Sequence, residues 1–156
     1  MRRRALLLGV LSAMTIPVAI SAQTKDESDV RMVVAAFGKA LASGDSTAAI
    51  ALLHPEVAIF EGGWETLEDY RRGHLRADMR ALQALKQETL RDVIKVSGDL
   101  ALSTREYSST GTIGERKVDS VGVETMVLLR TGEGWKIRHI HWSSRARRPA
   151  GNGGHP

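Results

Sequence analysis

The last apolar stretch of the chain carries two histidines in the segment His139-Ile140-His141-Trp142. An imidazole titrates near neutral pH, so it can exchange a proton with a ligand or bind a divalent metal. Alternate residues of an extended strand share a face, which places His139, His141 and Ser143 together and Trp142 on the opposite face. We therefore predict that this strand turns one histidine-bearing side toward a binding pocket.

A second pair of ionisable residues, His74 and Asp78, lies four positions apart in a segment with helical periodicity. This spacing puts both side chains on the helix face that also carries Leu75 and Leu82. A histidine and a carboxylate on a buried face cost free energy unless they find partners. The two side chains either pair with each other or face a cavity, and the sequence leaves both arrangements open.

Glu61 follows Val57 and Ile59 at alternate positions of a short predicted strand, so it ends the inward face of that strand. The predicted catalytic set is Glu61, His74, Asp78 and His141, and the predicted hydrogen-bonding residues of the pocket are Tyr70, His139, Ser143 and Thr125. Such a set can perform acid–base chemistry in which a carboxylate orients an imidazole. The alternative is a divalent metal bound by two imidazoles and carboxylates. No other cofactor is predicted.

The elements that must position these residues follow from periodicity and from capping residues. Thr66 and Asp69 form a capping-box pattern at the start of the longest helix, and Gly98-Asp99 marks a hairpin turn. The predicted helices cover residues 28–41, 48–53 and about 66–86, and the predicted strands cover residues 57–61, 90–96, 100–109, 121–129 and 135–143. The order of elements indicates an α+β fold, in which a curved antiparallel sheet wraps around the long third helix and leaves a concave pocket.

The two ends of the chain differ in composition from the rest. A basic start, an apolar run of 16 residues over 5–20 and the small residues Ser21-Ala22 form the pattern of a signal peptide. We expect a signal peptide over 1–22, a folded domain over 23–144 and a disordered basic tail over 145–156. The protein is then periplasmic or secreted and has no stable membrane association after cleavage. An uncleaved anchor is the alternative, although a membrane span needs about 20 apolar residues.

The charge and cysteine content exclude several classes of function. The chain has 22 basic and 18 acidic residues, but three of the basic residues lie in the predicted signal peptide and three in the tail. The domain therefore keeps 16 basic residues against 18 acidic ones, so the positive net charge does not indicate a nucleic-acid partner. The chain contains no cysteine, which excludes thiol catalysis, zinc–thiolate sites and redox dithiols.

Several motifs resemble the exported SnoaL-like branch of the nuclear-transport-factor-two-like superfamily. They are Glu61-Gly62-Gly63, the segments 70–79, 98–101 and 124–128, and the ending Gly134-Trp135-Lys136-Ile137 with His141-Trp142-Ser143-Ser144. The resemblance covers about residues 28–144. It implies a cone-shaped curved sheet around a long helix, a homodimer formed through sheet faces, and a pocket for an unknown small molecule. It does not imply one activity, because the superfamily includes isomerases, cyclases, dehydratases and non-catalytic modules.

These expectations lead to one principal hypothesis and two alternatives. The principal hypothesis is an exported small-molecule-binding domain that can act as an enzyme through His/carboxylate acid–base chemistry. A non-catalytic dimeric accessory module is the first alternative. The second is a lyase like the iota-class carbonic anhydrases, whose terminal strand carries a histidine run; here Ile140 and Trp142 occupy two of its positions. The ketosteroid isomerase pattern also requires a tyrosine paired with a carboxylic acid, and the sequence does not assign that pair.

Overall fold

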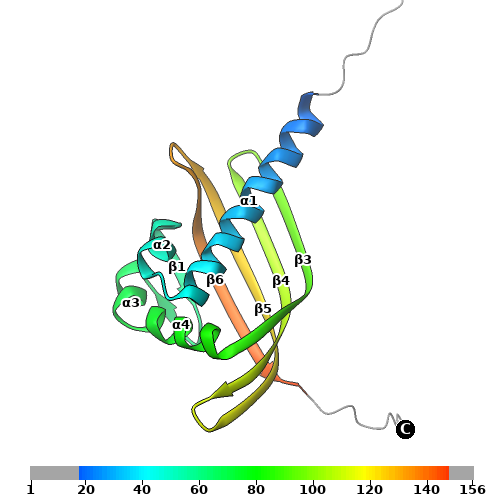
Figure 1. Ribbon diagram of the computed structural model, residues 1–156. Coiled ribbons are helices and arrows are strands. Elements are labelled where there is room, and N and C mark those ends of the chain that lie inside the picture. The colour runs from blue at the N-terminus through cyan, green and yellow to red at the C-terminus, as the bar shows by residue number, and fades with distance from the viewer. Residues whose placement is uncertain (1–17, 148–156) are drawn as a thin grey trace, which may run out of the picture.

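The computed structural model of the protein describes residues 18–147 and forms an α+β fold around one curved, unclosed sheet (Figure 1). The sheet has the strand order β2-β1-β6-β5-β4-β3, and all neighbouring strands are antiparallel except β1 and β6. The helices are α1 (Val18–Ser43), α2 (Ser46–Ala51), α3 (Leu67–Arg72) and α4 (His74–Ala84). The strands are β1 (Leu53–Phe60), β2 (Trp64–Glu65), β3 (Leu85–Ser97), β4 (Leu100–Ile113), β5 (Arg116–Thr131) and β6 (Gly134–Ala146). The predicted fold class is confirmed, with one parallel strand pair added.

The long helix on the concave side of the sheet is α1, and not the predicted third helix (Figure 1). It contacts β3, β4 and β6 on one side and α2 and α4 on the other. Val30, Phe37 and Leu41 point from α1 into the core and are at most 2% exposed. Burying side chains of this size stabilises the fold by roughly 1.5–3 kcal/mol each. The contact with the sheet therefore fixes the position of α1.

The predicted helix over residues 66–86 is divided at Gly73 into α3 and α4. The capping box is present as predicted, because Thr66 accepts a hydrogen bond from the Asp69 amide and Asp69 accepts one from the Thr66 amide. Gly73 has φ −113° and ψ −93°, outside the helical region. Glycine lacks a side chain that favours the helical conformation and weakens a helix by roughly 1 kcal/mol relative to alanine. His74 consequently becomes the first residue of a new helix.

A β-bulge in β6 changes which side chains of the last strand face the core. Ile137 pairs with Leu128 and His139 pairs with Val127, so Arg138 has no partner of its own on β5. An extra residue of this kind shifts the alternation of side chains by one position. Ile137 and Ile140 are both fully buried as a result. The prediction of an uninterrupted alternation along this strand is therefore wrong from Arg138 onward.

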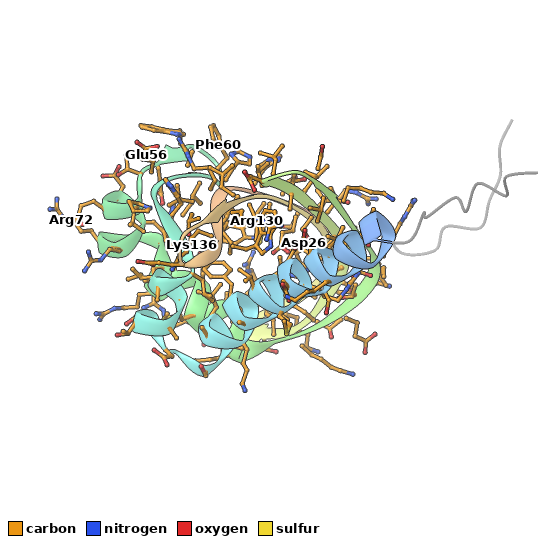
Figure 2. The ribbon with its side chains drawn as sticks, turned by 90° about the horizontal axis from the view of Figure 1, so that it is seen from above. Asp26, Glu56, Phe60, Arg72, Arg130 and Lys136 are labelled. Atoms are coloured by element: carbon orange, nitrogen blue, oxygen red, sulfur yellow. The ribbon has the colours of Figure 1, made fainter. Side chains whose placement is uncertain are left out.

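Two basic side chains at the ends of the last strands connect α1 and α2 to the sheet (Figure 2). The Arg130 guanidinium lies 2.6 Å from Asp26 of α1 and 3.2 Å from Asp99 in the β3–β4 turn, and it stacks 4.4 Å above the Trp135 ring. The Lys136 ammonium donates a 2.7 Å hydrogen bond to the carbonyl group of Ala51 at the end of α2. These contacts complement the apolar contacts between the helices and the concave face.

The predicted signal peptide lies mainly outside the described residues, and its part from Val18 onward belongs to α1. Strand β6 continues two residues beyond the predicted end of the domain, to Ala146, and most of the predicted tail lies outside the described residues. Among the helices that the structure describes, none has the length and apolarity needed to cross a membrane.

The Gly122→Ala substitution should lower the free energy of unfolding by about 1–3 kcal/mol, because the protein has no room for a side chain at this position. The Cβ would lie 2.5 Å from the ring of Tyr107, which packs over Gly122 from the neighbouring strand. Chemical denaturation measures the change. Gly63→Ala is the control, because its Cβ would meet no atom within 4 Å. Equal stabilities of the two variants would contradict this packing.

Candidate active site

A cavity of about 700 Å³ lies between α1, α4 and the concave face of the sheet. Its apolar walls come from all three parts of the fold and include Val34, Phe37, Leu41, Leu82, Ile94, Met126 and Trp142. Its ionisable lining residues are Arg31, Glu61, Asp78, Asp92, Arg105, Tyr107, Arg116 and Glu124. The size and the mixture of apolar walls with a few polar groups are typical of a small-molecule site.

Strand register places many of these polar groups in one row across the sheet. Trp142 of β6 is opposite Glu124 of β5, Glu124 is opposite Arg105 of β4, and Arg105 is opposite Asp92 of β3. At the other end of the row, Phe60 pairs with His141, so Glu61 leaves β1 at the level of Trp142. We call this row the charged row; it consists of Glu61, Trp142, Glu124, Arg105 and Asp92.

The Glu124 carboxylate is the buried centre of this row, with 6% of the residue exposed. It accepts a 2.8 Å hydrogen bond from the Trp142 indole and a 3.3 Å hydrogen bond from an Arg105 guanidinium nitrogen. Arg105 also donates to the Gln87 side chain at 3.2 Å and stacks 4.6 Å above the Tyr107 ring. A buried carboxylate needs such partners, since an unpaired buried charge is strongly destabilising.

Asp78 faces the cavity from α4 and has one hydrogen-bond partner behind it. The fully buried Tyr70 hydroxyl donates a 2.8 Å hydrogen bond to the Asp78 carboxylate. Burial raises the pKa of Asp78 from 3.8 to about 6, and the negative charge of Glu61 adds to the increase. Burial and the Asp78 charge raise the pKa of Tyr70 well above its usual value, so Tyr70 remains a neutral donor. Asp78 can therefore both accept and release a proton near neutral pH.

Tyr107 lines the cavity but is not among the predicted site residues. Its ring packs over Gly122, and burial followed by the negative charge of Glu124 raises the pKa of its hydroxyl. The phenol therefore remains protonated and can donate a hydrogen bond to a ligand oxygen. The alternation of Ser103, Arg105 and Tyr107 along one strand is the signal that would have placed it beside the other polar lining residues.

The structure brings Glu61 and Asp78 to the cavity, but it places His74 beside it. The His74 imidazole is half-exposed, and its Nδ1 atom lies 2.5 Å from a carboxylate oxygen of Glu65. The break at Gly73 explains this position, because His74 begins α4 and turns toward the β2 strand. Tyr70 lies behind Asp78 and is not among the residues that line the cavity. A pair between His74 and Asp78 was one of the two arrangements that the sequence left open, and it does not form. His74 pairs with Glu65 and Asp78 with Tyr70.

The other predicted pocket residues lie on the outer face of the sheet. His141 is paired with Thr125, and neither residue lines the cavity. His139 packs against the Phe60 ring at 5.3 Å, and Ser143 lines a shallow depression on the outer side. Burial, and then His141, lowers the pKa of His139. The bulge at Arg138 is the physical reason for the three residues of β6, because it turns His139, His141 and Ser143 outward and turns Trp142 into the cavity.

The candidate metal ligands are not brought together in the part of the chain that the structure describes. No group of three or more histidine, aspartate and glutamate side chains there has a geometry that could bind a metal ion. The two histidines of β6 and the carboxylates of Glu61 and Asp78 belong to opposite faces of the sheet. The ionisable groups that line the cavity are carboxyl, phenol and guanidinium groups, and the Trp142 indole and several hydroxyl groups lie beside them.

The Asp78→Asn substitution should increase the free energy of unfolding at neutral pH by about 1–3 kcal/mol. The folded protein binds the Asp78 proton more tightly than the unfolded chain, so an ionised Asp78 destabilises the fold above its folded pKa of about 6. The gain should decrease as the pH falls from about 6 to 4 and vanish below that window, where Asp78 is protonated in both states. Denaturant melts of both proteins across this pH range measure it. A gain that does not change with pH would contradict the raised pKa.

The chain matches the SnoaL-like domain family over residues 30–147. It is similar to the solved structure of a candidate ketosteroid isomerase from Shewanella frigidimarina NCIMB 400, with 35% identity and a TM-score of 0.72 over 76% of this chain and 97% of that chain. A candidate dehydratase of the NTF2-like family from Streptomyces avermitilis has 22% identity and a TM-score of 0.67, over 80% of this chain and 99% of that chain.

The same fold also occurs in a protein described as a hub. The CaMKII hub of S. rosetta has 22% identity and a TM-score of 0.64, over 76% of this chain and 96% of that chain. Similarity at this level of identity concerns the fold alone. No curated protein matches the chain.

Proposed function

The chain belongs to the SnoaL-like domain family, and we propose that it is an enzyme of the isomerase or dehydratase kind acting on a small carbonyl compound. The observation that carries the proposal is Asp78, a carboxyl group that faces the cavity and has a pKa of about 6. The fully buried Tyr70 hydroxyl holds this carboxyl group in place. The similarity to a candidate ketosteroid isomerase and a candidate dehydratase supports the same class of reaction.

In the proposed reaction, the Asp78 carboxylate removes a proton from a carbon next to the substrate carbonyl group. The electron pair of the broken C–H bond forms a carbon–carbon double bond, and the carbonyl oxygen gains negative charge. The Tyr107 hydroxyl donates a hydrogen bond to that oxygen, which lowers the energy of the transition state. Asp78 then returns the proton to a different carbon, which completes an isomerisation. Transfer of the proton to a leaving hydroxyl group, which departs as water, completes a dehydration instead.

The residues around Asp78 support this assignment in two ways. Glu61 faces the same cavity, and its negative charge raises the pKa of Asp78. The Asp78 carboxylate is therefore a stronger base. Tyr70 contacts Asp78 from behind and acts as a positioning residue, since it does not line the cavity. Tyr70 and Asp78 are not the tyrosine–carboxylic acid pair that binds the oxyanion in ketosteroid isomerases, because Tyr70 donates to Asp78 and does not line the cavity.

NMR tests the proposed reaction with two assays. One follows deuterium incorporation next to the carbonyl group of apolar cyclic ketones, and the other follows isomerisation of a β,γ-unsaturated ketosteroid. Asp78→Asn should lower the rate by a factor of about 100 or more, and Tyr107→Phe by about 10 to 100. Thr125→Val on the outer face should retain the wild-type rate. An Asp78→Asn variant with the wild-type rate would disprove the assignment. A wild-type protein that is inactive on every ketone would favour a binding module.

The outer face of the sheet supports a second part of the proposal, a homodimer formed through this face. Leu102 and Val123 of β4 and β5 are 41% and 49% exposed there. Exposed apolar side chains gathered on one face are typical of a protein–protein interface. Members of this fold also assemble, as the CaMKII hub illustrates. Dimerisation is compatible with both an enzyme and a non-catalytic accessory module.

The double substitution Leu102→Lys and Val123→Lys should convert the dimer into a monomer, because it places like charges at the centre of the proposed interface. Native mass spectrometry of protein purified from whole cells that express the full chain counts the subunits. Met32→Lys is the control, since Met32 is an exposed apolar residue of α1. A dimer that survives the double substitution would exclude this face. The subunit mass from the same measurement tests the proposed removal of residues 1–22 and hence export.

The carbonic anhydrase alternative receives no support from the cavity. Its expected histidines, His139 and His141, lie on the outer face, and Trp142 occupies the cavity side of the strand. Acid–base chemistry at Asp78 needs neither histidine.

A further inference from the structure

The β4–β5 hairpin extends the cavity beyond the charged row. It projects past the other strands in Figure 1. Arg116, Val118 and Ser120 occupy alternate positions at the start of β5, and all three line the cavity. Ile113, which is opposite Arg116 on β4, lines it as well. The inner side of the hairpin is therefore a continuation of the ligand site.

Arg116 differs from the other two arginines of the cavity in its charge environment. Arg31 forms an ion pair with Asp92, and Arg105 forms one with Glu124. Within residues 25–147, no carboxylate oxygen lies within 4.0 Å of the Arg116 guanidinium. This end of the cavity therefore carries a positive charge that no carboxylate of the described chain compensates through an ion pair.

The surface between Arg116 and the charged row is polar but uncharged. Ser109 is opposite both Gln87 on β3 and Ser120 on β5, and all three side chains line the cavity. Ser109 is only 4% exposed. The apolar side chains of Leu85 and Val118 lie on the cavity wall nearby. This region can hold an apolar molecule that carries a few oxygen atoms.

The two ends of the cavity thus have opposite charge. Glu61 and Asp78 are carboxyl groups at one end, and Arg116 is a cation at the other. Glu61 lies at the level of Glu124 in the strand register, and Arg116 is eight residues from Glu124 along β5, which corresponds to roughly 26 Å of extended strand. A ligand that reaches both ends must be elongated. Guanidinium groups bind carboxylates and related oxyanions through charge-assisted hydrogen bonds.

We propose that the natural ligand is an amphipathic organic anion, with an apolar body in the cavity and an acid group bound by Arg116 at the β4–β5 hairpin. This inference rests on the proposed function only for the reacting end, which lies at Asp78. The acid group anchors the molecule at the hairpin and leaves its other end beside the proton-transferring carboxyl group. Arg116 is thus a specificity-determining residue, remote from the reacting atoms.

A matched pair of fluorescent probes tests the proposal. The anion 8-anilinonaphthalene-1-sulfonate and the neutral N-phenyl-1-naphthylamine share one apolar skeleton and differ in the sulfonate group. At low ionic strength, the wild-type protein should bind the anion more tightly. Arg116→Gln should weaken binding of the anion by about 5- to 10-fold and leave binding of the neutral probe unchanged. Arg116→Lys should retain most of the preference.

Lys117→Gln is the matched control, because it removes the same charge from the neighbouring position, which does not line the cavity. It should change the binding of neither probe. If the wild-type protein binds both probes equally, or if Arg116→Gln and Lys117→Gln have the same effect, the anion site is disproved while the proposed function stands. If the wild-type protein binds neither probe, the cavity does not accept apolar molecules, and both proposals fail.

Discussion

The buried carboxylate of Glu124 is the constraint on which the arrangement of the site depends. A charge in this position is tolerated only with hydrogen-bonding partners, which come from Arg105 on β4 and Trp142 on β6. For the indole to reach Glu124, β6 must turn Trp142 to the concave side, and the bulge at Arg138 makes this possible. The same shift sends His139 and His141 outward. One buried charge thus connects the strand register, the position of the aromatic ring and the absence of both imidazoles from the cavity wall.

Local patterns predicted the elements well, because they depend on neighbouring residues. The capping box at Thr66 and Asp69 is present, and the cavity-facing positions of Asp78 and Glu61 followed from helical and strand periodicity. The face of the last strand was not predictable in this way, since the bulge depends on the pairing of β6 with β5. The position of His74 was missed for a similar reason. A break at one glycine, with a carboxylate from a different strand as partner, leaves no periodic signal.

The family explains the shape of the protein better than its chemistry. The same curved sheet occurs in a candidate isomerase, a candidate dehydratase and an assembly hub, so the fold alone does not select among them. The difference must come from a few side chains on the concave face. Here a carboxyl group with a pKa near neutrality lies at the boundary between an apolar wall and a charged row. That combination supports the proposed proton transfer, because an asparagine could accept the Tyr70 hydrogen bond without the cost of burying a charge.

The free edges of the open sheet bear on aggregation. An exposed edge strand can pair with a strand of another molecule, and proteins suppress this with short strands, charges and bulges. One edge here is β2, which has only two residues. The other is the 13-residue β3, which carries Lys86, Arg91 and Lys95 and is interrupted by a bulge between Thr89 and Arg91. Both edges are thus poor templates for strand addition, so the chain can expose apolar side chains on its outer face without a comparable risk of growing into extended sheets.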